Sequence, residues 1–130
     1  MTSNAVSLYI HIPFCIKKCV YCAFTSLPAA GEEIKQAYFE ALCAQINTFP
    51  CDKTIRTVYF GGGTPPVIGT HRLAAICELI AKRFSLAEGC EITAEVNPKS
   101  IAAQGLCELR SAGFNRLSVG VQSANDDILA

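Results

Sequence analysis

The chain has 130 residues, a length that suits one domain, and 51% of them are hydrophobic, which excludes a disordered tail. Eleven Lys and Arg residues balance eleven Asp and Glu residues, so no positive charge excess points to nucleic acid or to an anionic membrane surface. No apolar run reaches the about 18 residues that a membrane span needs, and the first residues lack the features of a signal peptide. We therefore expect a cytoplasmic protein with no membrane span and no nucleic acid partner.

Strands and helices are expected to alternate along the sequence. A short apolar run over 8–12 predicts the first strand, and residues 54–60, rich in β-branched and aromatic side chains, predict the second. Two more strands are expected over 91–96 and 116–121. Such alternation favours an α/β fold with parallel strands and right-handed crossovers.

Amphipathic spacing predicts a helix in each connection between these strands. The first should run from about 32 to 49, with an apolar face made of Ile34, Tyr38, Ala41, Leu42, Gln45 and Phe49. The later helices are expected to have caps or ends at Thr70, Ser100, Gly113 and Asn125.

Polar and apolar side chains alternate along the predicted strands, which is unusual for parallel strands covered on both faces. Successive strand residues point to opposite faces, so apolar side chains should lie under the helices and polar ones on the other face. The polar set is Ser7, Tyr9, His11, Glu91, Thr93, Glu95, Asn97, Arg116, Ser118, Gly120 and Gln122. Buried carboxylates and amides need a partner, so the pattern favours an open barrel lined for a ligand; a sheet with one solvated face is the alternative.

Eight cysteines are many for a chain without an export signal, and in a reducing compartment they point to metal binding rather than to disulfides. Five are dispersed and are expected to pack as small apolar side chains: Cys43, Cys51, Cys77, Cys90 and Cys107.

The other three cysteines, Cys15, Cys19 and Cys22, lie within eight residues. Three thiolates on one loop can bind three irons of a [4Fe–4S] cluster and leave the fourth iron open for a ligand that is not protein. A structural zinc site needs four protein ligands, so zinc would require a distant fourth Cys. That alternative and chance clustering stay open at this point.

The C-x3-C-x2-C spacing, with Tyr21 before the last Cys, resembles the signature of the radical S-adenosylmethionine (SAM) superfamily. Four further stretches narrow the resemblance: YIHIPFC at 9–15, VYFGGGTP at 58–65, EITAEVNP at 91–98 and RLSVGVQS at 116–123. Together they resemble the family of oxygen-independent coproporphyrinogen III oxidase and the related heme chaperone, from about Leu8 to the last residue.

The resemblance implies a fold: the N-terminal part of a partial (β/α)6 TIM-like radical SAM barrel, with about four parallel strands and intervening helices. Residues 1–130 would form an incomplete radical SAM core domain with its cluster loop at about 13–25, and the C-terminal part of the barrel and a C-terminal domain would be absent. A pocket shortened in this way is expected to bind a cluster weakly and not to turn over a porphyrin.

The resemblance also implies a site. Cys15, Cys19 and Cys22 would ligate the [4Fe–4S] cluster, whose open iron would bind SAM and pass it the electron that generates a 5′-deoxyadenosyl radical. The implied SAM contacts are Tyr9, Tyr21, Gly62, Gly63, Thr64, Glu95 and Gln122, the last to a second SAM where one binds. From the residues alone, the Gly61–Gly63 run indicates either close approach of backbone to a ligand or a plain tight connection.

Three other residues are interpreted structurally. His11 on the polar face is expected to be a hydrogen-bonded structural residue, and His71 a residue on a helix surface. Arg116 is expected to form a buried ion pair, with Glu91 as its partner.

The family has branches, and the sequence favours the heme chaperone-like one. The oxidase branch usually has another Cys two residues after the cluster motif, where this chain has Phe24. The alternatives are an oxygen-independent coproporphyrinogen III oxidase, which decarboxylates propionates oxidatively to give protoporphyrinogen IX, and a radical SAM heme-degrading enzyme or a non-functional fragment. Whether the chain is an enzyme stays open. The implied partners are SAM, a porphyrin or heme, and an electron donor such as flavodoxin or ferredoxin.

Overall fold

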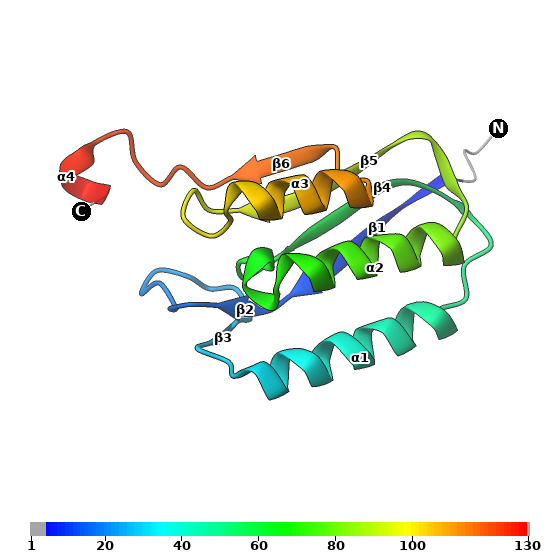
Figure 1. Cartoon of the computed structure of the whole chain (residues 1–130), viewed down its shortest axis with the longest axis horizontal. Helices are drawn as coiled ribbons and strands as arrows, with labels where there is room; N and C mark the ends of the chain where they lie inside the picture. The colour runs from blue at the N-terminus through cyan, green and yellow to red at the C-terminus, as the bar shows by residue number, and fades with distance from the viewer. Residues whose placement is uncertain (1–4, 130) are drawn as a thin grey trace.

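The computed structural model describes residues 5–129, and a four-stranded parallel sheet forms its centre. The strands are β1 (Ala5–Ile12), β4 (Thr54–Gly62), β5 (Leu86–Val96) and β6 (Arg116–Val119), and they lie side by side in this order (Figure 1). All four predicted strands are therefore confirmed. The first and third begin several residues earlier than expected, and the fourth ends at Val119 instead of residue 121.

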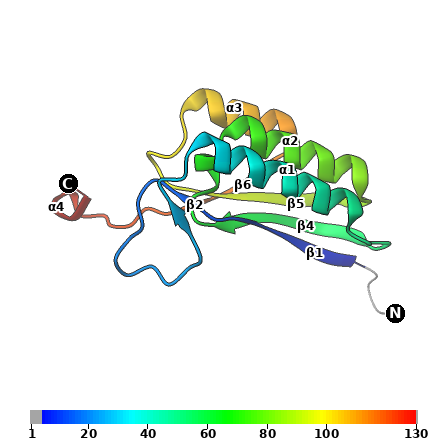
Figure 2. The same cartoon turned by 90° about the horizontal axis from the view of Figure 1, so that it is seen from below.

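One helix follows each of the first three strands of this sheet: α1 (Glu32–Thr48), α2 (Thr70–Arg83) and α3 (Ala103–Ala112). A 3-10 turn, η1 (Pro65–Ile68), joins β4 to α2, and α4 (Asp126–Leu129) is a single short turn. Figure 2 shows the three long helices on the same face of the sheet. No helix of the described residues combines the length and apolar character that a bilayer span requires.

The core lies between the sheet and these helices. Ile12, Phe60 and Ala94 are fully buried on the sheet side, and Leu73, Ile76 and Ile80 of α2 are buried against them. Burial of apolar surface of this extent is the main stabilising contribution to the fold.

The predicted apolar face is confirmed for β1 and β5 but not for the last strand. Leu117, Val119 and Val121 remain 40–62% exposed. The helix that follows β6 is α4, which lies beyond the end of the sheet and does not cover the strand (Figure 1).

Two predicted caps are wrong. Gly69, not Thr70, occupies the N-cap position of α2, and the Thr70 hydroxyl donates instead to Glu108 of α3. The N-cap of α3 is Ala102; the Ser100 hydroxyl closes the turn after β5 by bonding to the backbone of Asn97. In both places the hydroxyl makes a tertiary or turn hydrogen bond instead of capping the N-terminus of the helix.

The predicted end of α3 is confirmed. Gly113 adopts a left-handed conformation with φ 111°, and its N–H bonds back to the carbonyl of Arg110. This is the conformation that favours glycine after a helix.

The apolar face of α1 is rotated from its predicted position. Ile34 is 54% exposed and Phe49 48% exposed, whereas Ile46 is buried. Tyr38, Phe39, Leu42 and Cys43 pack beside Ile46 against the core. At 100° per residue, positions 39, 42, 43 and 46 share one side of a helix, and residues 34, 41 and 45 lie well away from it.

The five dispersed cysteines do not share one environment. Cys77 is buried, Cys43, Cys51 and Cys90 are half-buried, and Cys107 is exposed on α3. The prediction of simple core packing is therefore right for Cys77 and wrong for Cys107.

Cys77 is expected to resist alkylation while Cys107 reacts. Burial, with smaller contributions from Glu78 and Cys90, raises the pKa of the Cys77 thiol to about 11, so at pH 8 almost none of it is the reactive thiolate. Iodoacetamide labelling of the native protein at pH 8, read by peptide mass spectrometry, measures both rates. Equal labelling of Cys77 and Cys107 in the folded protein would contradict the packing described here.

Candidate functional site

A cavity of about 380 Å³ lies at the carboxyl ends of β4, β5 and β6, under the loop that carries the three clustered cysteines. Nine of the ten predicted site residues line it: Cys15, Cys19, Tyr21, Cys22, Gly62, Gly63, Thr64, Glu95 and Gln122. Tyr9 is the tenth; it lies on the same face of the sheet but is not part of the lining. Segments more than 100 residues apart in the sequence thus meet at the edge of the sheet where α/β barrels place their sites.

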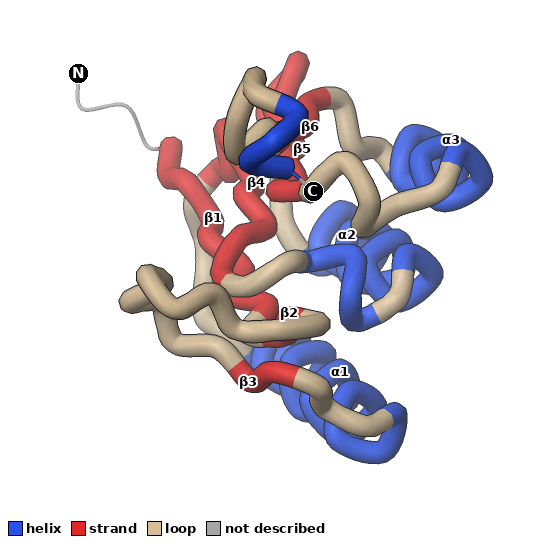
Figure 3. Tube along the Cα trace, turned by 90° about the vertical axis from the view of Figure 1, so that its left-hand side faces the viewer, coloured by secondary structure: helices blue, strands red, loops and turns tan. Residues whose placement is uncertain are grey.

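The cysteine loop is closed at its base by two short strands that the sequence did not predict. β2 (Phe14–Cys15) pairs in parallel with β3 (Leu27–Pro28). The Leu27 N–H donates to the Pro13 carbonyl at 2.6 Å, and the Ala29 N–H to the Cys15 carbonyl at 3.0 Å. Figure 3 shows this loop and the segment after β6 at the same end of the molecule. The base of the loop is therefore fixed, while its outer residues Ile16 and Val20 are exposed.

The glycine run serves close packing of the chain against itself. The Gly63 N–H donates to the Ile12 carbonyl at 2.8 Å, and the Thr64 N–H to the Phe14 carbonyl at 2.7 Å. A Cβ on Gly63 would lie 2.5 Å from the Phe14 carbonyl oxygen and 2.8 Å from the Cys15 sulfur. Glycine is required there because only a residue without a side chain lets the cysteine loop approach β4 this closely.

Glu95 is held by two donors in the cavity wall. The Tyr59 hydroxyl donates to Glu95 Oε1 at 2.7 Å, and the Gly62 N–H lies 3.3 Å from Oε2. Tyr59 also stacks on Tyr9, with ring centroids 6.2 Å apart. Sequence reasoning missed Tyr59, although the alternation of buried Val58 and Phe60 around it could have placed it on the polar face.

Replacing Tyr59 with Phe is expected to lower the free energy of unfolding by about 1 kcal/mol at pH 8, because one hydrogen bond to Glu95 is lost. That hydrogen bond, with burial and other smaller effects, raises the pKa of Tyr59 above 10.0. The bond therefore contributes fully below the pKa of an unfolded tyrosine and is lost as pH rises through the raised value. Urea unfolding of both proteins from pH 8 to 11 should show the difference shrinking above pH 10; a constant difference would contradict this account.

His11 is a hydrogen-bonded structural residue, as predicted. Its Nε2 lies 3.2 Å from the Thr25 carbonyl and its Nδ1 3.1 Å from the Tyr9 hydroxyl. Because a carbonyl only accepts, Nε2 carries the proton and Nδ1 accepts from Tyr9. His11 thus links β1 to the far end of the cysteine loop.

Tyr21 and Gln122 meet across the mouth of the cavity, with the Tyr21 hydroxyl 3.4 Å from Gln122 Oε1. Gln122 has a left-handed φ of 67°, which is rare for a residue with a side chain. The neighbouring Cys19, with smaller contributions from burial and from Cys22, raises the pKa of Tyr21. This contact between Tyr21 and Gln122 therefore joins the cysteine loop to the segment that follows β6.

Asn97 and Ser118 also line the cavity, and the sequence assigned them only to the polar face. Asn97 Nδ2 lies 3.4 Å from the Thr64 hydroxyl. The contact joins the end of β5 to the glycine run.

The predicted Arg116–Glu91 ion pair forms, with 3.3 Å between Nη1 and Oε1, but it is not buried. The two side chains are 52% and 48% exposed, because Arg116 is the first residue of the edge strand. A pair this exposed contributes little to stability. His71 is exposed on α2, as predicted.

The three clustered thiols are compatible with a multi-iron cluster. Cys15, Cys19 and Cys22 are free and line the same cavity. No three Cys, His, Asp or Glu side chains in residues 5–129 are grouped as ligands of one metal ion. Thiolates that each bind a different iron need not converge on one point. The close approach of Cys15 to Gly63 and an unpartnered Ser26 hydroxyl in the same wall are further features of a site built around a bound group.

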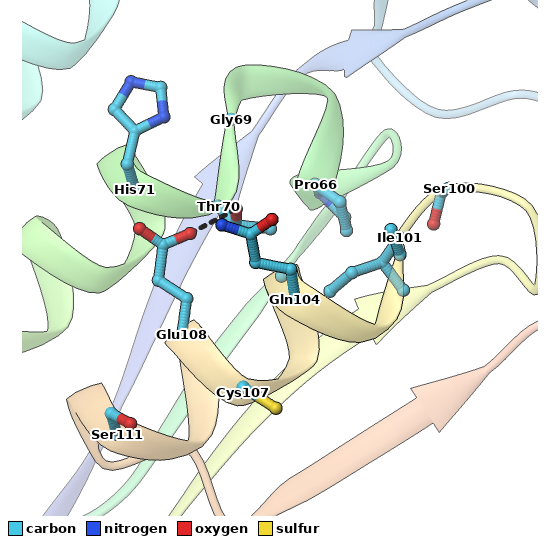
Figure 4. Close-up of a pocket in the computed structure, with 12 residues that line it drawn as sticks. Pro66, Gly69, Thr70, His71, Ser100, Ile101, Gln104, Cys107, Glu108 and Ser111 are labelled. Atoms are coloured by element: carbon cyan, nitrogen blue, oxygen red, sulfur yellow. Dashed lines mark hydrogen bonds between the residues drawn. The ribbon is translucent and has the colours of Figure 1, made fainter.

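A second, larger hollow of about 750 Å³ lies between the N-terminal ends of α2 and α3 (Figure 4). Thr70 and Glu108 are hydrogen-bonded there, and His71 and Cys107 do not point toward each other. None of the predicted site residues lines it.

Comparison with known proteins agrees with this geometry. The model of the radical SAM superfamily matches residues 9–130. The chain belongs to the radical SAM superfamily. Membership in this superfamily implies a [4Fe–4S] cluster and SAM, and the match includes every residue of the cavity wall.

Similar proteins include several that are named heme chaperones. The chain is 35% identical over 127 residues to the heme chaperone HemW of Escherichia coli K12, covering 95% of this chain and 34% of that protein. It is 37% identical over 129 residues to HemW of Lactococcus lactis, covering 99% of this chain and 34% of that protein. It also matches bovine radical S-adenosyl methionine domain-containing protein 1, mitochondrial, at 35% identity over 127 residues. The match covers 95% of this chain and 28% of that protein.

A solved structure confirms the fold. Coproporphyrinogen III oxidase (HemN) from Escherichia coli, described as a radical SAM enzyme, superimposes with a TM-score of 0.84 and 34% identity, covering 94% of this chain and 29% of that one. The four-stranded sheet thus matches the N-terminal part of a radical SAM TIM-like barrel. The chain spans about a third of the length of the HemW proteins it matches.

Proposed function

We propose that the chain forms the N-terminal part of a radical SAM core domain that acts in porphyrin or heme metabolism, in the heme chaperone-like branch. In this proposal Cys15, Cys19 and Cys22 hold a [4Fe–4S] cluster and the cavity beneath them binds SAM. The observation that carries it is the convergence of three cysteines, the glycine run, Glu95 and Gln122 on one cavity.

The cavity residues have distinct roles in this proposal. Three thiolates hold three irons, and the cluster, when bound, supplies the electron for reductive cleavage of SAM. Glu95, oriented by Tyr59 and by the Gly62 N–H, would accept hydrogen bonds from SAM. Tyr21, 78% exposed beside Cys22, would pack on the adenine ring.

Thr64 and Asn97, which contact each other, would offer further hydrogen bonds at the glycine run. Gln122, in the segment after β6, would contact a second SAM where one binds. Tyr9 stacks on Tyr59 and would act on SAM through Glu95 rather than by direct contact.

The heme chaperone-like branch is supported by the names of the relatives and by Phe24. Its aromatic side chain is 69% exposed and lines the cavity at the position that the oxidase branch gives to a further Cys. An exposed aromatic residue at the cavity suits contact with the flat, apolar face of heme. The alternative, a coproporphyrinogen III oxidase, is favoured by the structural neighbour.

A ligand titration separates the two branches. The reconstituted chain is titrated anaerobically with ferric heme and, separately, with coproporphyrinogen III, and binding is followed by Soret absorbance and by equilibrium dialysis. Saturable binding of heme, weakened in Phe24→Ala, would support the chaperone-like branch. Binding of coproporphyrinogen III in preference to heme would support the oxidase branch and refute the first assignment.

The electron donor and the compartment complete the proposal. We propose a low-potential donor such as flavodoxin or ferredoxin, and a reducing compartment such as the cytoplasm. A cluster held by Cys15, Cys19 and Cys22 needs thiolates that are not oxidised to disulfides, and a reducing compartment keeps them so. Reduction of the reconstituted cluster by reduced flavodoxin, followed by EPR, tests the donor.

A further inference from the structure

Ser26 carries a buried hydroxyl whose role the fold does not explain. Within residues 5–129, its Oγ is the only buried side-chain N or O atom without a hydrogen-bond partner. It lines the cavity that contains Cys15, Cys19 and Cys22. A buried hydroxyl without a partner is costly, and in native proteins a water, an ion or a bound group usually completes it.

The backbone on both sides of Ser26 is anchored by hydrogen bonds. The next residue, Leu27, donates its N–H to Pro13, and the preceding carbonyl, that of Thr25, accepts from His11. Ser26 therefore sits between two anchored peptide groups, on the return of the cysteine loop to β2.

The acceptors available to this hydroxyl are limited by its position. Ser26 follows Cys22 by four residues, and two residues later Pro28 pairs with Cys15 in the β2–β3 ladder. The carboxylate of Glu95 in the same cavity accepts from Tyr59 and from the Gly62 N–H and makes no hydrogen bond with the Ser26 hydroxyl. The reactive groups that flank Ser26 are therefore two proposed iron ligands. Cys22 precedes it in the loop, and Cys15 lies opposite Pro28 in the ladder.

We infer that the Ser26 hydroxyl donates a hydrogen bond to a sulfur atom of the bound cluster, either a cysteine thiolate or an inorganic sulfide. The inference rests on the proposed function, since it requires a cluster at Cys15, Cys19 and Cys22. Ser26 is a positioning and tuning residue and does not contact the reacting bond of SAM.

Such a bond has a defined consequence. Reduction adds one negative charge to the cluster, and a hydrogen bond to sulfur stabilises the more negative state, so the reduction potential rises. Ser26 would thereby make the cluster easier for its donor to reduce.

The test compares Ser26→Ala, which removes the hydroxyl, with Ser26→Thr, which keeps it. Thr25→Ala is the matched control, because Thr25 is exposed on the same loop and its side chain does not line the cavity. Each protein is reconstituted anaerobically with iron and sulfide and titrated electrochemically without SAM, with EPR as the readout. Ser26→Ala should show a tenfold lower ratio of reduced to oxidised cluster at a given potential, a shift of about 59 mV to more negative values for one electron. Ser26→Thr and Thr25→Ala should match the parent.

A second measurement uses the apo proteins. Without a cluster the hydroxyl has no partner to lose, so Ser26→Ala should unfold at the same or a higher urea concentration than the parent. Loss of the cluster from Ser26→Ala, with retention in Ser26→Thr and unchanged apo stability, would also support the inference.

Three results would overturn it. These are an unchanged potential in Ser26→Ala, a destabilised apo Ser26→Ala, or an effect confined to SAM affinity, which would make SAM the acceptor. A parent protein that takes up no cluster would refute the proposed function itself, and that failure is visible before any variant is made.

Discussion

Cys19→Ala is expected to lose the [4Fe–4S] cluster. Removal of one of three thiolate ligands leaves a second iron without a protein ligand. The affinity for the cluster should therefore fall by more than the about 10–100-fold seen when a residue behind a metal ligand is removed. Cys19 is the best choice of the three because it is exposed, so its replacement costs the apo protein little stability. Iron and sulfide content and the charge-transfer absorbance after anaerobic reconstitution measure the effect.

Cys107→Ala is the matched control for this experiment. Cys107 is also exposed and free, but it lies on α3 and lines the separate hollow between α2 and α3. The variant should bind iron and sulfide as the parent does. Full iron content in Cys19→Ala, or equal losses in the two variants, would refute the assignment of ligands.

Gly63→Ala should both destabilise the fold and prevent cluster uptake. The added Cβ would meet the Phe14 carbonyl oxygen at 2.5 Å and the Cys15 sulfur at 2.8 Å. Since backbone must move to relieve the first contact, we expect a loss of about 1–3 kcal/mol in the free energy of unfolding. The same movement displaces a proposed iron ligand, so cluster content should fall more than stability alone explains.

Gly31→Ala separates crowding from the general cost of replacing glycine. Gly31 precedes α1 with an ordinary φ of −68°, and a Cβ added there would meet no atom within 4 Å. The variant should lose less than about 1 kcal/mol and keep its cluster. Urea unfolding of the apo proteins and iron analysis of the reconstituted ones measure both effects. A Gly63→Ala protein that equals Gly31→Ala in both would contradict the close approach of the cysteine loop to β4.

The strand positions could be predicted because alternation is a local property of the sequence. Tyr9, His11, Thr93 and Glu95 lie on the polar face of the sheet, as their positions in the strands require. The helix details depended on tertiary contacts instead. Thr70 bonds to Glu108 of a neighbouring helix, and no local pattern shows that this contact displaces a cap.

The cavity could be predicted from five motifs in order, because parallel strands bring their carboxyl ends to one edge. The pairing of side chains across that edge could not be predicted, since it joins residues far apart in the chain. Tyr59 reaches Glu95 from a strand 36 residues earlier, and Gln122 meets Tyr21 across 101 residues. The burial of the Ser26 hydroxyl likewise depends on the way the loop returns to β2, since its neighbours Thr25 and Leu27 are exposed.

The glycine run shows what the sequence predicts and what it leaves open. The sequence indicates that backbone must come close at Gly61–Gly63, but it does not say to what. In the fold, the partner at Gly63 is the cysteine loop itself. The glycines thereby shape the site by positioning Cys15, whether or not their backbone also contacts a ligand.

EPR of the reconstituted, dithionite-reduced chain, recorded with and without SAM under anaerobic conditions, tests whether the three cysteines hold a cluster with an open iron. We expect a [4Fe–4S]⁺ signal whose g values shift when SAM is added, because three cysteine ligands leave one iron open to it. Absence of any cluster signal, or a signal that SAM leaves unchanged, would contradict the claim that Cys15, Cys19 and Cys22 form an open-iron site above a SAM cavity.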